Sequence, residues 1–129
     1  MQLILASAFL FAVAAGAGNS SSDEAIASAV GYLLSCQNQD GGFGADPESD
    51  SDIKATSLAA IALAAAGENL SSLAMNGTNP LQYLVSKQGE LDNMSNVEAQ
   101  VGRYVVALAS GGLDPGDING RDYREILKG

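Results

Sequence analysis

The sequence predicts an all-α protein built from repeated pairs of helices. Three observations lead to this prediction. Apolar residues recur at helical spacing in successive stretches that are bounded by capping residues or glycines. Two of these stretches have similar sequences at regular separations, as structural repeats do. The chain has 129 residues, which allows one small domain, so the repeats must pack on one another.

The first helix of the first pair is predicted over residues 23–37. Residues 21–24 (SSDE) have the sequence of a capping box, in which a serine accepts from free backbone amides and a glutamate reaches back. Apolar residues then follow at helical spacing and form one stripe: Ile26, Val30, Leu33 and Leu34. Because its remaining positions are polar, we expect this helix to be an outer one.

The second helix of the pair is predicted over residues 52–66. Asp50 and Asp52 supply acceptors and negative charge at its start, and Gly67 ends it. No charged residue follows Lys54 within it. Since such a helix is apolar all round, we expect an inner helix that is buried on nearly all sides.

The second pair is predicted over residues 80–88 (outer) and 95–110 (inner). Asn79-Pro80 begins the outer helix, because proline suits the first helical position. Residues 95–98 (SNVE) have the sequence of a second capping box, and Gly111-Gly112 ends the inner helix. The apolar stripe of the inner helix contains Val97, Val101, Tyr104, Val105 and Leu108.

The two pairs are repeats of one another. Residues 32–37 (YLLSCQ) match residues 83–88 (YLVSKQ) at an offset of 51. Residues 62–67 (ALAAAG) match residues 107–112 (ALASGG) at an offset of 45, so the second repeat has the shorter loop. Residues 121–128 are similar to the opening helix of a third unit. Each unit is therefore predicted to be helix, loop, apolar helix and linker.

The residues that follow the first outer helix point to a family. Residues 37–44 (QNQDGGFG), after YLL at residues 32–34, resemble the repeat of the terpene cyclase and protein prenyltransferase superfamily, which includes squalene cyclase-like proteins. Members form an α/α toroid, a ring of six outer and six inner helices. The resemblance covers about residues 23–128 and implies an incomplete toroid of two helix pairs and the start of a third. Residues 76–84 (NGTNPLQYL) look typical of the secreted prokaryotic branch, which is similar to the helical domain of cobalamin-binding proteins.

The motif residues have structural roles in this interpretation. We expect Gly41 and Gly42 to permit a tight, left-handed exit from the outer helix. We expect Phe43 to fill the gap between successive helix pairs and Gln37 to hydrogen-bond the loop backbone. The second repeat keeps Gln88 but has lost the glycines and the phenylalanine. A ligand contact by Gln37 or Phe43 is the alternative.

The composition excludes several classes of site and partner. The chain has 15 Asp and Glu, 6 Lys and Arg, a net charge of −9, one Cys and no His. We therefore expect no zinc site, no disulfide and no cofactor, and Cys36 to be a buried packing residue. The negative charge opposes binding to phosphates, so we expect neither nucleic acid nor an anionic membrane surface as partner.

The catalytic chemistry of the family is not expected in this chain alone. Its prenyltransferases bind zinc through Asp, Cys and His, and this chain has no His. Its triterpene cyclases use an Asp-x-Asp-Asp motif and an aromatic cavity, whereas residues 50–53 (DSDI) lack the last Asp. No Gly-x-Ser-x-Gly elbow and no phosphate-binding glycine loop occur.

The acidic loop of the first repeat is a weak candidate for calcium. Asp46, Glu48, Asp50 and Asp52 alternate along it, as oxygen ligands do in some calcium loops. The glycine and the distal bidentate glutamate of an EF-hand are both missing. We expect a solvated loop with a helix cap, and calcium binding is the weaker alternative.

The N-terminal residues 1–17 have the features of a secretory signal peptide. Residues 3–15 (LILASAFLFAVAA) form an apolar run that is too short to span a membrane. Ala15-Gly16-Ala17 is a small-x-small pattern, with cleavage expected after Ala17. No Lys or Arg precedes the run, so a buried N-terminal helix and an uncleaved anchor remain alternatives.

The predicted mature chain is therefore an extracellular or cell-surface partial toroid of residues 18–129. Four Asn-x-Ser/Thr sequons fit this location and make glycosylation a candidate modification, although such motifs also arise by chance. They begin at Asn19, Asn69, Asn76 and Asn93.

Two functional hypotheses follow. The first is a secreted, non-catalytic toroid repeat module that binds a small-molecule or protein ligand at the cell surface. The second is a fragment of a terpene cyclase or prenyltransferase-type enzyme whose catalytic residues lie outside this sequence. Two helix pairs cannot close a ring, so both hypotheses predict apolar edges that are covered by self-association or by further repeats.

Overall fold

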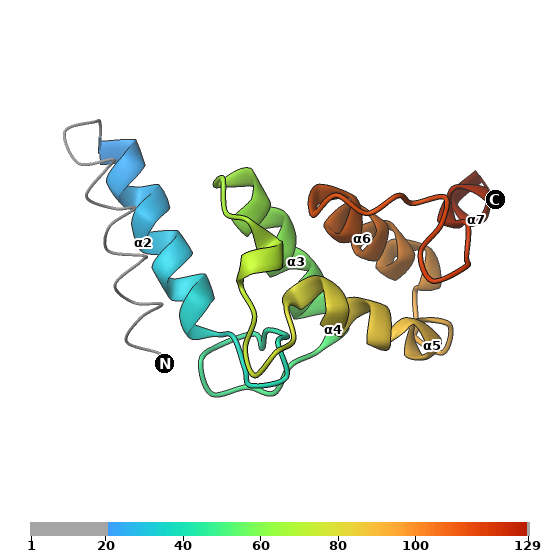
Figure 1. Cartoon of the computed structure of the whole chain (residues 1–129), viewed down its shortest axis with the longest axis horizontal. Coiled ribbons are helices and arrows are strands. Elements are labelled where there is room, and N and C mark those ends of the chain that lie inside the picture. Colours follow the sequence, from blue (N-terminus) through green and yellow to red (C-terminus); the bar gives the residue numbers. More distant parts are fainter. Residues whose placement is uncertain (1–20, 129) are drawn as a thin grey trace. The chain divides into compact units, whose positions relative to one another are not determined.

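The computed structural model describes residues 21–128, which form helices joined by loops and turns (Figure 1). No strand occurs among these residues, so the predicted all-α fold class is confirmed. The chain divides into two compact units, Met1–Ser35 and Cys36–Gly129. The predicted signal peptide and the sequon at Asn19 lie outside the described residues.

The described part of the first unit is one helix, α2 (Ser21–Ser35). It confirms the first outer helix, with both ends two residues earlier than predicted. Ser21 is itself helical, so the capping box that treats Ser21 as the cap is wrong. Asp23 and Glu24 instead lie in the first turn, where negative charge is favourable. Ile26 is 50% exposed, so the predicted apolar stripe is only partly covered.

The first inner helix, α3 (Ile53–Ala65), begins where the sequence predicts because Asp52 caps it. The Asp52 carboxylate accepts a hydrogen bond from the Ala55 N–H at 2.7 Å. One face is buried, and it contains Ile53, Thr56, Ser57, Ala59, Ala60 and Leu63. The prediction of burial on nearly all sides is wrong, since Leu58 on the other face is 47% exposed.

The second outer segment, predicted as one helix over residues 80–88, consists of two. α4 (Pro80–Ser86) begins with a capping box in which the Asn79 and Gln82 side chains each accept from the other's N–H at 2.9 Å. The backbone leaves the helical conformation at Lys87 (φ −98°, ψ 8°). A separate short helix, α5 (Gln88–Leu91), follows.

The second inner helix, α6 (Val97–Ser110), packs on α3 and makes the most extensive helix contact within residues 36–128 (Figure 1). The capping box predicted at residues 95–98 is wrong. Asn96 precedes the helix in the left-handed conformation (φ 56°), and its side chain makes no capping hydrogen bond. The predicted stripe is buried at Val101, Tyr104, Val105 and Leu108.

The third unit opens with α7 (Tyr123–Lys128), which contacts α6 as α4 contacts α3. A 3₁₀ helix, η1 (Leu70–Ser72), lies in the linker between α3 and α4 and contacts both. The core of residues 36–128 therefore forms between α3, α4 and α6. No helix among the described residues is long and apolar enough to cross a membrane.

Candidate functional site

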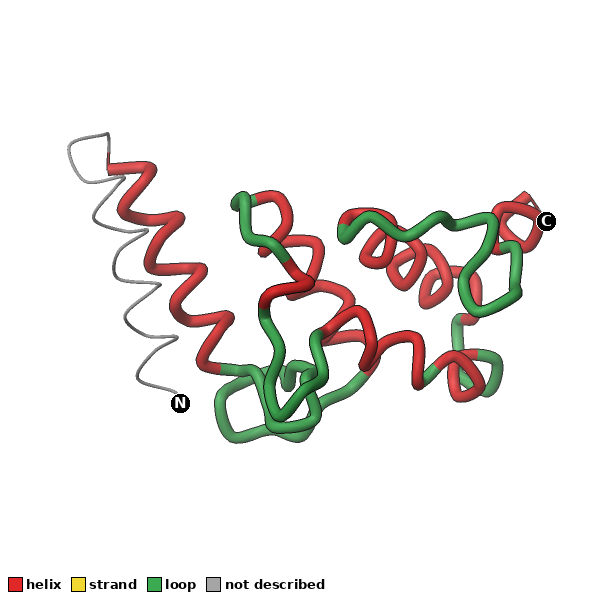
Figure 2. The backbone as a smooth tube through the Cα atoms, in the orientation of Figure 1, coloured by secondary structure: helices red, strands yellow, loops and turns green. Residues whose placement is uncertain are grey.

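The motif residues of the first repeat converge on the junction with the second repeat. The Gln37 Nε2 donates to the carbonyl oxygens of Gly41 at 3.1 Å and of Leu73 at 2.7 Å. Gly41 lies in the same loop, whereas Leu73 lies in the linker between α3 and α4. Figure 2 shows this loop and this linker meeting below α3 and α4. Gln37 therefore closes its own loop and fastens it to the start of the next repeat.

The two glycines let this loop lie against the second repeat. Gly41 is left-handed (φ +88°), and a Cβ added there would collide with the carbonyl oxygen of Thr78. A Cβ on Gly42 would lie 2.8 Å from the Tyr83 ring. The need at Gly41 is therefore both conformational and steric, and the need at Gly42 is steric.

Phe43 ties the same loop to the inner helix of its own repeat. Its side chain is fully buried. Its N–H donates to the Thr56 hydroxyl at 2.9 Å, and its carbonyl oxygen accepts from the Asp52 N–H at 3.2 Å. Because Thr56 and Asp52 belong to the first turn of α3 and its cap, Phe43 holds the loop at the start of this helix.

A small polar network completes the loop. Asn38 Nδ2 donates to the Ser49 carbonyl at 3.0 Å and to the Ser51 hydroxyl at 2.9 Å. The Asp40 carboxylate accepts from the Gly42 N–H at 3.0 Å and from the Ser51 hydroxyl at 2.7 Å. The loop is therefore held by side chains that the sequence analysis did not single out, and no spacing rule identifies such pairs.

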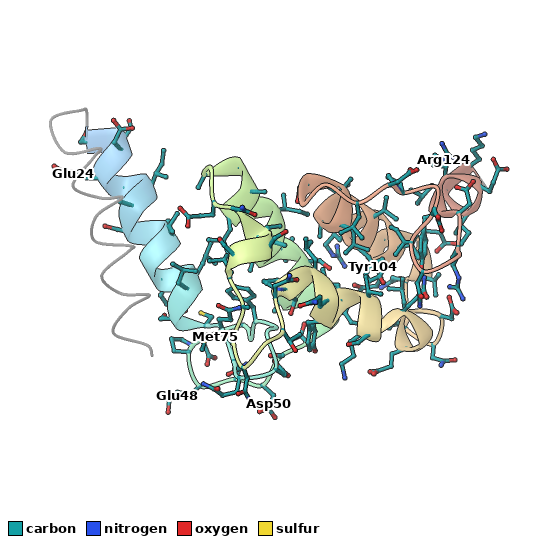
Figure 3. The ribbon with its side chains drawn as sticks, in the orientation of Figure 1. Glu24, Glu48, Asp50, Met75, Tyr104 and Arg124 are labelled. Atoms are coloured by element: carbon teal, nitrogen blue, oxygen red, sulfur yellow. The ribbon has the colours of Figure 1, made fainter. Side chains whose placement is uncertain are left out.

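The acidic residues of the loop do not gather around a metal position. Asp52 caps α3, and Asp46 accepts from the Glu48 N–H at 2.9 Å, which lowers the pKa of the Asp46 carboxyl. Glu48 and Asp50 project outward from the loop (Figure 3). Among residues 21–128, no three His, Cys, Asp or Glu side chains lie close enough together to hold a metal ion.

The second repeat uses Gln88 in the same way as Gln37. The Gln88 Nε2 donates to the Ile118 carbonyl at 2.9 Å, and its Oε1 accepts from Asn119 Nδ2 at 3.2 Å. Ile118 and Asn119 lie in the linker between α6 and α7. Gln88 therefore joins the second repeat to the third unit. Leu91 is fully buried in this repeat, which has lost the phenylalanine.

Both linkers contain the same tight turn, which the sequence analysis missed. Residues 75–78 and 118–121 each form an antiparallel bridge around an Asn-Gly pair. The φ values are 55° and 86° at Asn76-Gly77, and 53° and 84° at Asn119-Gly120. Positive φ at both positions is typical of a type I′ turn, for which Asn-Gly is the strongest sequence signal.

The second repeat replaces a backbone contact with an ion pair. Where Gly41 packs against Thr78, the corresponding Arg121 is held by Asp92. One guanidinium nitrogen of Arg121 lies 2.9 and 3.1 Å from the two carboxylate oxygens of Asp92, which raises the pKa of Arg121. The junction therefore survives the loss of the glycines because a charged pair spans the gap.

The phenol groups in the core act as hydrogen-bond donors. Tyr104, labelled in Figure 3, donates its hydroxyl to the Leu84 carbonyl at 3.0 Å and so joins α6 to α4. Burial and the neighbouring Tyr123 raise the pKa of Tyr104 well above its usual range. Burial raises the pKa of Tyr83 to about 12. Both groups are therefore neutral at physiological pH and serve in packing.

The described residues also contain a groove along α4, with a volume of about 590 Å³. Its apolar lining comes from Leu81 and Val85 of α4 and from Leu113 of the following linker. Its other lining residues are Asn79, Gln82, Ser86, Gly89 and Asn119. The sequence analysis did not predict it, because it forms between segments that are about 30 residues apart.

The sequence model of the prenyltransferase alpha-alpha toroid domain matches residues 3–124. The chain belongs to this family. The match confirms the resemblance inferred from residues 37–44, and it begins within the segment predicted to be a signal peptide. No curated protein and no solved structure matches the chain significantly. Gln37 and Gln88 are thus the residues that join successive repeats of this toroid.

Proposed function

We propose that this toroid chain is a non-catalytic repeat module that binds an apolar ligand or partner surface through the groove on α4. One observation carries the proposal: the polar side chains of the repeat motif are engaged in joining repeats. Gln37, Gln88 and Asp40 each hydrogen-bond a loop or linker of the same chain. The motif that identifies the family is therefore used for architecture.

The groove supplies the binding surface in this proposal. Its volume of about 590 Å³ lies within the usual range of ligand sites, roughly 300–1,000 Å³. Leu81, Val85 and Leu113 offer apolar contacts, and the side-chain amides of Gln82 and Asn119 offer hydrogen bonds at its margin. This combination suits a ligand with an apolar body and one polar end.

An extracellular or cell-surface location is part of the proposal. Asn69, Asn76 and Asn93 are exposed, as glycosylation of their sequons requires. The signal peptide of residues 1–17 stays a prediction.

The groove is tested with the full chain and the apolar fluorophore 1-anilinonaphthalene-8-sulfonate. We expect saturable binding that is weakened at least threefold by Val85→Gln, because this change places an amide in the apolar lining. The matched control is Val106→Gln, since Val106 is 52% exposed on α6 and does not line the groove. Equal binding by wild type and Val85→Gln would contradict the proposed site.

The non-catalytic character needs its own assay. We expect no turnover when the full chain is incubated with a prenyl diphosphate and a cysteine-containing acceptor peptide, or with squalene. Product formed by the wild type with either substrate would contradict it and favour the enzyme-fragment hypothesis.

A further inference from the structure

The outer helix α7 leaves apolar residues exposed that its counterpart α4 buries. Residues 75–84 and 118–127 correspond at an offset of 43, from the Asn-Gly turn into the helix. Tyr83 and Leu84 of α4 are 4% and 0% exposed. The corresponding Ile126 and Leu127 of α7 are 45% and 48% exposed. The same position in the repeat is therefore covered once and open once.

The cover of α4 comes from the inner helix of its own repeat. α4 contacts both α3 and α6, and Tyr104 of α6 donates its hydroxyl to the Leu84 carbonyl at 3.0 Å. α7 contacts α6 as α4 contacts α3, and no described residue takes the place beside α7 that α6 takes beside α4. The surface that α7 leaves open, formed by Ile126 and Leu127, thus fits one further inner helix.

The chain contains a third sequence of the inner-helix type, in residues 3–15. Residues 12–15 (AVAA) correspond to residues 62–65 (ALAA) of α3 and 107–110 (ALAS) of α6. The distance to the next outer helix also agrees: 19 residues from Val13 to Tyr32, 20 from Leu63 to Tyr83, and 18 from Leu108 to Ile126. The family match begins at residue 3 and so includes this run.

This correspondence places specific residues at the open surface. In the alignment, Phe9 corresponds to Tyr104, which contacts α4. Val13 corresponds to Leu63 and Leu108, and both of these are fully buried. An apolar run with large residues at these two positions has the chemistry needed to cover Leu127.

We propose that residues 3–15 of a second copy of the chain cover α7, and that two copies close one toroid by exchanging this contact. Each copy has three outer-type helices (α2, α4 and α7) and three inner-type segments (residues 3–15, α3 and α6). Two copies supply six of each, the number in the closed toroid of this family. The contact joins different surfaces of the two copies, and such a contact stays finite when its rotation closes a ring.

The inference gives residues 3–15 a role that excludes cleavage after Ala17. It is independent of the groove on α4, because Ile126 and Leu127 do not line that groove. Failure of the groove assay therefore leaves the dimer intact, and failure of the dimer leaves the groove assay intact.

The test is sedimentation equilibrium of the full 129-residue chain over a hundredfold range of concentration. We expect a dimer of about 26 kDa, twice the chain mass of 13.1 kDa, with an N-terminus upstream of residue 18. Leu127→Asp and Val13→Asp should each raise the dimer dissociation constant at least a hundredfold. The matched control is Val106→Asp, since Val106 is 52% exposed on α6 and should leave the dimer unchanged.

A mixing experiment separates loss of the contact from loss of folding. The Leu127→Asp chain keeps an intact residue 3–15 segment, and the Val13→Asp chain keeps an intact α7 surface. Each alone should be monomeric, and the equimolar mixture should form a heterodimer through the one remaining good contact.

Three results would overturn the proposal. They are a wild-type monomer at all concentrations, a distribution of larger open assemblies, and a wild-type dimer that Leu127→Asp does not weaken. The first result is the one expected if α7 is covered by further repeats of a longer chain.

Discussion

Replacing Gln37 with alanine tests the role of the repeat motif most simply. The substitution removes two hydrogen bonds, to the Gly41 carbonyl at 3.1 Å and to the Leu73 carbonyl at 2.7 Å. Each such bond contributes about 0.5–1.5 kcal/mol net, and a buried carbonyl left without a partner adds to the loss. Since Gln37 is half-buried, water reaches part of the vacated space. We expect Gln37→Ala to lower the free energy of unfolding by about 2 kcal/mol.

The assay is urea unfolding followed by circular dichroism at 222 nm, with all variants at one protein concentration. Gln39→Ala is the matched control, because Gln39 is exposed in the same loop and should change stability by less than about 0.5 kcal/mol. Gln37→Glu keeps the size of the side chain but faces two carbonyl oxygens with a carboxylate, so it should be at least as destabilising at pH 7. A Gln37→Ala loss no larger than that of Gln39→Ala would refute the reasoning.

Four further predictions concern the core, the phenols, the second junction and the acidic loop. Phe43→Ala should cost about 3–5 kcal/mol in urea unfolding, because it empties a fully buried site. The pKa of Tyr83 is raised to about 12 in the folded chain, so its contribution is present below pH 10 and is lost as the pH rises toward 12; a stability difference between wild type and Tyr83→Phe that stays constant from pH 8 to 12 would contradict this. Asp92→Asn should cost about 0.2–1 kcal/mol at low salt and less in 1 M NaCl, since Asp92 and Arg121 form an exposed pair. Millimolar calcium should leave the midpoint of thermal unfolding unchanged, because no metal-binding cluster forms in residues 46–52.

The sequence predicted helices well where a local device fixes their ends. Asp52 caps α3 and Asn79-Pro80 begins α4, and both helices begin at the expected residue. It failed at Asn96, where serine and glutamate have the spacing of a capping box but the chain enters the helix through a left-handed residue. Capping sequences describe what a backbone is able to do, and the packing of α6 on α3 decides which option is used.

The junction between repeats was only partly predictable. Gln37 and Phe43 were found because the motif is local, yet their partners Leu73 and Thr56 lie 36 and 13 residues away. The Asp92–Arg121 pair gave no signal in the sequence, since surface charges are common and their pairing depends on the fold. The Asn-Gly turns did carry a signal, and repeating it at both linkers would have predicted them.

Hydrogen exchange at the two linkers tests most directly the central claim that each repeat's glutamine holds the next linker. The amides of Met75 and Thr78 are bonded across the first turn at 2.9 and 3.0 Å, and those of Ile118 and Arg121 across the second at 3.0 and 3.1 Å. We expect Gln37→Ala to speed exchange in residues 73–78 alone, and Gln88→Ala to speed it in residues 118–121 alone. Unchanged protection at both linkers, or an equal loss at both in either variant, would contradict the account.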